Sequence, residues 1–153
     1  MSEIPPADRY FEDFAVGDLF TLGSVTVDEA EMLEFSRFYD PQPFHIDPDA
    51  AAESHFGGII ASGWHTGSMM MRLLTEGFLG VSSMGSPGLE NLAWPTPVRA
   101  RDVLTLGVEV LDSRASKTKP HMGILKVRQF LLNQDGDLAF DATAVMMIAR
   151  RQG

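Results

Sequence analysis

The spacing of apolar residues changes once along the chain, near Leu89. Before this point, apolar residues recur every three or four positions over long stretches, which predicts helices. After it they alternate with other residues, which predicts strands. The alternating positions form three sets: Leu104, Leu106, Val108 and Val110; Leu125, Val127, Gln129 and Leu131; and Phe140, Ala142, Ala144, Met146 and Ile148.

The first part of the chain predicts a strand followed by an amphipathic helix. The strand covers residues 18–27, and the helix begins after Asp28. Asp28 and Glu31 have the spacing of a capping box. Pro41 ends the helix near Asp40. The predicted apolar face of this helix comprises Met32, Phe35 and Phe38 or Tyr39.

A proline-rich segment from Asp40 to Pro48 follows and predicts a stiff, non-helical loop. Residues 49–55 predict a short helix. A longer helix is predicted from about Gly63 to Leu79. It is apolar on most sides, which predicts that it is buried. Its apolar positions include Met69, Met70, Leu73, Leu74 and Phe78.

These elements predict an α+β fold. Asp135 and Gly136 separate the last two alternating runs and indicate a hairpin. One long buried helix and one large antiparallel sheet must cover each other. The 153 residues, 44% of them hydrophobic, are enough for a core, and we expect one domain over residues 1–153 with its core between about 10 and 150.

The composition narrows the classes of function. There is no cysteine, which excludes disulfides and thiolate chemistry. The net charge of −9 argues against nonspecific nucleic-acid binding. The sequence shows neither a secretory signal nor a membrane-spanning run, so we expect a soluble cytoplasmic protein with no nucleic-acid or membrane partner.

Asp40 and His45 are the first candidates for chemistry. They lie five residues apart on the stiff segment. A carboxylate and an imidazole suit general acid–base catalysis, because histidine titrates near neutral pH. On spacing alone the plainer interpretation is favoured, in which Asp40 ends the helix and His45 packs in the loop.

Ser62 and Gly63 begin the long helix. The first N–H groups of a helix lack intrahelical partners, and glycine lets a ligand approach them closely. Such a terminus can stabilise an oxyanion. An ordinary serine N-cap beside a glycine required for packing explains the same two residues.

The remaining candidates favour structural or surface roles. His45, His55 and His65 do not have metal-ligand spacing, so we expect no metal site, and His55, His65 and His121 are expected to be structural or surface histidines. Lys117 and Lys119 lie in a predicted loop and could meet a nucleotide phosphate, although a solvated basic loop is the favoured interpretation. No nucleophile elbow, glycine-rich phosphate loop or dinucleotide motif is present, so no cofactor is expected.

Taken together, residues 39–69, YDPQPFHIDPDAAAESHFGGIIASGWHTGSM, resemble the signature of the MaoC-like dehydratases and (R)-specific enoyl-CoA hydratases. Two later segments, TPVRARDVLTLGVEVLDSR and NQDGDLAFDATAVMMIARR, resemble that family's strand regions more weakly. The positions that match the signature are Asp40, Pro43, His45, Asp47, Pro48, Ala61 and Gly63. Four positions depart from the family pattern: Gln42 replaces asparagine, Phe44 a smaller aliphatic residue, Ser62 histidine and Arg101 glycine.

The resemblance implies a hot-dog fold, in which an antiparallel sheet wraps around a long helix, and a homodimer. It also implies reversible hydration of a trans-2-enoyl-CoA, with Asp40 and His45 as the catalytic pair and the Gly63 N–H as the oxyanion donor. By the same resemblance the substrate contacts are Gln42, Pro43, Phe44, Ser62 and Trp64. An acyl-CoA thioesterase and a non-catalytic acyl-CoA-binding subunit are the alternatives.

Overall fold

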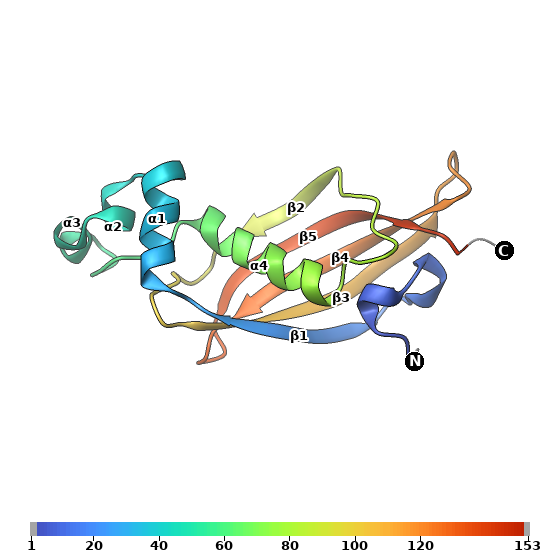
Figure 1. Ribbon diagram of the computed structural model, residues 1–153, viewed down its shortest axis with the longest axis horizontal. Helices are drawn as coiled ribbons and strands as arrows, with labels where there is room; N and C mark the ends of the chain where they lie inside the picture. The colour runs from blue at the N-terminus through green and yellow to red at the C-terminus, as the bar shows by residue number, and fades with distance from the viewer. Residues whose placement is uncertain (1–2, 152–153) are drawn as a thin grey trace.

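A five-stranded antiparallel sheet with one long helix lying across it forms the body of the molecule (Figure 1). The computed structural model describes residues 3–151. The strand order is β1-β3-β4-β5-β2. The strands are β1 (Leu19–Thr26), β2 (Gly88–Ala93), β3 (Val103–Ala115), β4 (Met122–Leu132) and β5 (Leu138–Ala149). The long helix is α4 (Gly63–Gly77), so the predicted α+β, hot-dog arrangement is confirmed.

The alternating rows predicted from the sequence form the inner face of the sheet. Every member of the three rows is 3% exposed or less. From the facing side α4 contributes Met69, Met70, Leu73 and Leu74. Burial of each large aliphatic side chain stabilises the fold by roughly 1.5–3 kcal/mol. The sheet and α4 therefore hold each other in place, and Gln129 is the one polar residue in the three rows.

Three shorter helices gather at one end of the sheet, beside the start of α4 (Figure 1). They are α1 (Glu29–Tyr39), α2 (Pro43–Ile46) and α3 (Pro48–Glu53). Two 3-10 turns, Pro6–Asp8 and Phe11–Asp13, lie at the opposite end near the chain termini.

Helix α1 confirms its predicted boundaries but not all of its predicted contacts. The Asp28 side chain accepts from the Glu31 N–H as predicted. The other hydrogen bond of the predicted capping box, from the Asp28 N–H to the Glu31 carboxylate, is wrong, because that carboxylate lies 3.1 Å from His65 Nε2 on α4. The predicted apolar face is also only partly buried: Met32 is buried, whereas Phe38 and Tyr39 are 75% and 76% exposed.

The prediction that residues 40–48 are non-helical is wrong, because α2 forms a full helical turn within them. Pro43 occupies the first position of this turn, where the missing N–H of proline has no helical partner to lose and its fixed φ favours the helix. Pro48 has the same place in α3, and the Asp47 side chain caps α3 by accepting from the Asp49 and Ala50 N–H groups. Prolines thus begin both turns.

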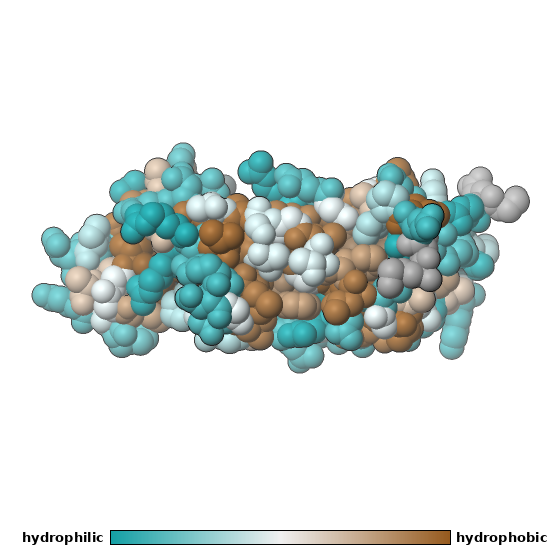
Figure 2. All heavy atoms as spheres, turned by 90° about the horizontal axis from the view of Figure 1, so that it is seen from below, coloured by the Kyte–Doolittle hydropathy of each residue, from teal (hydrophilic) through white to brown (hydrophobic). Residues whose placement is uncertain are grey.

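Strands β1 and β2 form the two edges of the sheet. Both are short relative to the central strands, and each pairs with register irregularities. Figure 2 shows the side of the molecule on which β1 lies, with apolar patches separated by polar side chains. Short, irregular edges of this kind discourage edge-to-edge aggregation.

Arg101 has a left-handed backbone, with φ of 71°, in the turn before β3. Its N–H donates to the Val27 carbonyl, which ties the turn to the end of β1. Within residues 3–151 its one ion pair is a distant, exposed contact of 3.8 Å with Glu29. The glycine common in the resembling family suits this conformation, and here arginine adopts it.

We expect Arg101→Gly to stabilise the protein by about 0.5–1 kcal/mol, because glycine removes the left-handed strain at a smaller entropic cost. Arg101→Ala is the matched control: it removes the exposed ion pair but keeps the strain, and it changes stability by less than about 0.5 kcal/mol. Urea unfolding of the three proteins measures both effects. Equal stability of the two variants would contradict the strain.

Candidate active site

Asp40 and His45 meet beside the beginning of α4. Asp40 is the C-terminal cap of α1, and His45 lies in α2. The turn of α2 brings His45 Nε2 to 3.2 Å from Asp40 Oδ2. The His45 side chain is 5% exposed and the Asp40 side chain 17% exposed. The structure therefore places this acid–base pair together in a largely buried position.

Two hydrogen bonds fix the Asp40 carboxylate. Ser62 Oγ donates to Oδ2 at 2.7 Å, and Gln42 Nε2 donates to Oδ1 at 2.7 Å. Burial by itself raises the pKa of Asp40. The hydrogen bonds from Gln42 and Ser62, with the charge of His45, outweigh burial and hold that pKa below its usual value. Asp40 is consequently an ionised acceptor at neutral pH.

The backbone carbonyl of Ile60 orients the His45 ring. His45 Nδ1 lies 2.7 Å from Ile60 O. A carbonyl only accepts hydrogen bonds, so Nδ1 carries a proton and donates it to Ile60. Nε2 is therefore the nitrogen that faces Asp40, and in the neutral ring it has a free lone pair.

The N-terminus of α4 lies next to this pair. Ser62 is its N-cap and accepts from the Trp64 N–H while donating to Asp40. Within residues 3–151, the Gly63 N–H has no acceptor in the chain. This free donor at the positive end of a 15-residue helix can bind an oxygen that carries negative charge.

Trp94, which follows β2, explains why residue 63 is glycine. Its indole N–H donates to the Gly63 carbonyl at 2.8 Å. A Cβ atom at residue 63 would lie 2.5 Å from the indole ring, which is closer than real contacts allow. The packing explanation given for Gly63 from sequence is therefore supported, and its N–H remains without an acceptor among the described residues.

A cavity of about 300 Å³ opens onto these groups. Of the predicted site residues, Asp40, Gln42, Phe44, His45, Gly63 and Trp64 line it. Pro43 and Ser62 do not line it: Pro43 starts α2, and Ser62 is fully buried beneath Asp40. The rest of the lining comprises Phe56, Ile60, Ala61, Thr66, Trp94, Thr96, Pro97 and Val98. Most of this lining is apolar; its polar part comprises the acid–base pair, the helix terminus and the side chains of Gln42, Thr66 and Thr96.

The sequence and fold of this chain match known proteins along most of its length. The family described as "MaoC like domain" matches residues 15–129. The chain belongs to the MaoC-like domain family.

Three relatives illustrate the match. The uncharacterized protein YdeM of Bacillus subtilis (strain 168) is 31% identical over 91% of this chain and 98% of its own. The MaoC-like dehydratase from Rhodospirillum rubrum is 38% identical, with a TM-score of 0.87 over 95% of this chain and 99% of its own. The (R)-hydratase from A. caviae involved in PHA biosynthesis is 29% identical, with a TM-score of 0.72 over 88% and 97%.

The other histidines and the two lysines considered in the sequence of this MaoC-like chain lie outside the cavity. His65 is 3% exposed and pairs with Glu31, whereas His55 and His121 are exposed. Lys117 and Lys119 lie in the β3–β4 loop, at the end of the sheet opposite α1–α3 (Figure 1). Among the described residues, no three His, Asp or Glu side chains group as metal ligands, and no helix has the length and apolarity to cross a membrane.

Sequence reasoning missed two contributors to the site. The Ile60 carbonyl sets the His45 tautomer, and Trp94 closes over Gly63. The contact of Ile60 is made by its backbone carbonyl, which every residue has, so the identity of the side chain could not predict it. Trp94 could have been suspected only as an aromatic residue close to a predicted strand.

We expect Gln42→Met to raise the pKa of Asp40, because it removes a donor to the charged carboxylate and leaves the opposing effect of burial in place. NMR titration of the Asp40 carboxyl carbon measures the change. Gln134→Met is the control, since Gln134 donates to Asp102 away from the site. A lower or unchanged pKa for Asp40 in Gln42→Met would contradict this assignment.

The same titration predicts how stability depends on pH. The pKa of Asp40 is lower in the folded protein, so its stabilising contribution is complete above the unfolded value of about 4 and is lost as the pH falls through the folded value. Gln42→Met brings the folded pKa of Asp40 closer to the unfolded value, so the variant loses less stability than the wild type when the pH falls through this range.

Gly63→Ala and Gly67→Ala form a matched pair on α4. The first places a Cβ against Trp94 at 2.5 Å, and we expect it to destabilise the fold by roughly 1–3 kcal/mol. The second places a Cβ at 3.6 Å from Phe140, an ordinary contact, and helix propensity then favours alanine by up to about 1 kcal/mol. Urea unfolding followed by tryptophan fluorescence separates them. Equal tolerance of both substitutions would contradict the packing of Trp94 on Gly63.

Proposed function

We propose that this protein is a hydratase that reversibly adds water to a trans-2-enoyl-CoA and forms a 3-hydroxyacyl-CoA. The observation that carries the proposal is the 3.2 Å contact of Asp40 Oδ2 and His45 Nε2, in a cavity that Gly63, with its free N–H, also lines. An acid–base pair and an oxyanion donor are the two devices that water addition to an enoyl thioester requires. The similarity to an (R)-hydratase supports the same chemistry.

The N-terminus of α4 is the proposed binding site of the thioester carbonyl. As water adds to the β-carbon, electrons move onto the carbonyl oxygen and form an enolate. The Gly63 N–H is oriented in advance toward this charge, which develops only during the reaction. A donor of this kind commonly contributes about 3–4 kcal/mol of transition-state stabilisation.

The proposed water binds beside the contact of His45 Nε2 and Asp40 Oδ2, within hydrogen-bond reach of both atoms. Its oxygen forms the new bond to the β-carbon, and its proton passes to the lone pair of Nε2. The resulting imidazolium returns this proton to the α-carbon, and the carbonyl double bond reforms. His45 is the proposed base because its Nδ1 proton is held by Ile60, which leaves the lone pair of Nε2 to accept a proton, whereas the Asp40 carboxylate is already an acceptor for Ser62 and Gln42. Asp40 orients the water and stabilises the imidazolium.

A homodimer of single-domain chains completes the proposal. Trp64 and Leu89 lie on α4 and the edge strand β2 and are 61% and 47% exposed, and Trp94 is 39% exposed. Large apolar side chains exposed together are typical of protein interfaces. A twofold dimer buries the same surface on both chains.

We expect Asp40→Asn and His45→Gln each to lower kcat for crotonyl-CoA hydration by about 10²–10⁴-fold, because each removes one partner of the water. Loss of the conjugated enoyl absorbance measures the rate, and circular dichroism verifies folding. Asp49→Asn and His55→Gln are the controls, since both residues are nearby and exposed. Near-normal turnover by either site variant would rule out the pair as the catalytic groups. Release of free thiol from a saturated acyl-CoA would favour the thioesterase alternative.

A further inference from the structure

Gln129 interrupts an otherwise apolar surface. It lies on β4 between Val127 and Leu131, in the row that faces α4. Its neighbours in the sheet register are Val108 on β3 and Ala142 on β5. Gln129 is 2% exposed, as buried as these apolar neighbours. A glutamine at such a position loses its hydration when the protein folds and needs another partner.

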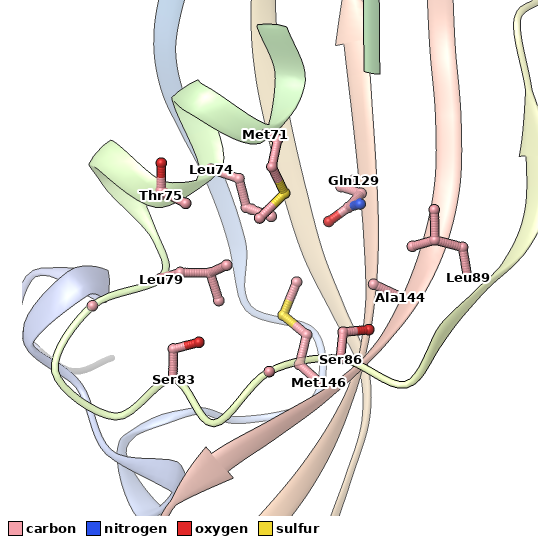
Figure 3. A pocket seen from close by; sticks show the side chains of 12 residues that line it. Met71, Leu74, Thr75, Leu79, Ser83, Ser86, Leu89, Gln129, Ala144 and Met146 are labelled. Carbon is pink, nitrogen blue, oxygen red and sulfur yellow. The ribbon is translucent and has the colours of Figure 1, made fainter. Parts of the chain in front are cut away.

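The Gln129 carboxamide lacks that partner on its oxygen. Within residues 3–151, Oε1 is buried and has no hydrogen-bond donor. Figure 3 shows the carboxamide projecting from β4 into a cavity, between Met71 and Leu89. Buried polar groups in native proteins are nearly always paired, so an unpaired oxygen that faces a cavity indicates a ligand that supplies the donor.

The cavity has a volume of about 400 Å³ and is mainly apolar. It lies between the C-terminal half of α4, the loop after it and strands β4 and β5 (Figure 3). Its apolar lining includes Met71, Leu74, Leu79, Leu89 and Met146. Three other polar side chains line it: Thr75 donates to Arg72 O, Ser86 donates to Val145 O, and Ser83 is exposed to solvent, so Gln129 is the buried one without a partner on its oxygen.

A second hollow of about 260 Å³ lies along α4 between this cavity and the candidate active site. It shares Met71, Leu89 and Gln129 with the larger cavity and Trp64 with the active-site cavity. The three hollows thus follow α4 from its N-terminus toward its C-terminus. Residue 71 is eight residues after Gly63, which corresponds to about 12 Å along the helix, the length of an acyl chain of about ten carbons.

We propose that Gln129 is a specificity-determining residue that selects acyl chains bearing a hydroxyl group near the tenth carbon. The inference rests on the proposed function, since it places the thioester at Gly63 and the chain along α4. The ligand hydroxyl donates to Oε1, and the carboxamide N–H can donate back to the hydroxyl oxygen. A plain hydrocarbon chain supplies no donor to Oε1, so it lacks this hydrogen bond and binds more weakly than the hydroxylated chain.

The test is the binding of two saturated ligands, decanoyl-CoA and 10-hydroxydecanoyl-CoA, by isothermal titration calorimetry. Neither ligand can be hydrated, so affinity is measured without turnover. We expect the wild type to bind the hydroxylated ligand about 5–10-fold more tightly. Gln129→Met, which has a similar volume and no polar group, loses or reverses this preference. Its melting temperature without ligand equals or exceeds that of the wild type, because it removes an unpaired buried oxygen.

Thr75→Val is the matched control, because Thr75 lines the same cavity and its hydroxyl is already paired; it keeps the preference for the hydroxylated ligand. Equal or tighter binding of decanoyl-CoA by the wild type, no binding of either ligand, or a preference that persists in Gln129→Met would each overturn the inference.

Crotonyl-CoA hydration separates this inference from the proposed function, because the crotonyl chain is too short to reach Gln129. If crotonyl-CoA is hydrated but the wild type does not prefer 10-hydroxydecanoyl-CoA, the role of Gln129 is rejected and the proposed reaction stands. A Gln129-dependent preference without hydration supports that role and rejects the proposed reaction.

Discussion

The hydrogen bond from Ser62 to Asp40 joins the two parts of the molecule on which the site depends. Ser62 is fully buried at the start of α4, and α4 is fixed by its packing on the sheet. Asp40 ends α1, which is otherwise connected to α4 by a few contacts such as that of Glu31 with His65. Through one hydroxyl, the rigid helix determines where the carboxylate lies. The same hydroxyl accepts from Trp64, so it also fixes the first turn of α4.

The site combines two kinds of polar group in mainly apolar surroundings. The carboxylate of Asp40 receives two hydrogen bonds, whereas the Gly63 N–H receives no acceptor from the described chain. The carboxylate and the residue with the free N–H therefore border the same small cavity, and the carboxylate takes its hydrogen bonds from other donors. This arrangement suits a reaction in which a proton leaves water beside Asp40 and His45 while negative charge develops on a carbonyl oxygen at the helix terminus.

Long periodic elements were predictable from the sequence, because burial on one face leaves a repeating pattern. The rows containing Leu104, Leu125 and Phe140 and the helix around Leu73 were predicted in this way. Predictions that depended on tertiary partners were less successful. Glu31 was expected to complete its own cap but pairs with His65, and the single turn of α2 is too short to leave a period.

The candidate site was also predictable only in part. The order of Asp40, His45 and Gly63 along the chain carries the family resemblance, and the structure brings the three together. The contributions of Ile60 and Trp94 come from a backbone carbonyl and from a ring distant in sequence. Gln129 was predicted to be part of an alternating strand. Its sequence position did not show that its side chain is buried or that its oxygen is unpaired, and these two features came from the structure.

The most direct test of the central claim is the fate of water oxygen. The wild-type protein is incubated with crotonyl-CoA in water enriched in oxygen-18, and the products are analysed by mass spectrometry. Hydration predicts an intact 3-hydroxybutyryl-CoA with one heavy oxygen in its hydroxyl group and no free coenzyme A. Free coenzyme A together with labelled crotonic acid, or recovery of unlabelled crotonyl-CoA alone, would contradict the account.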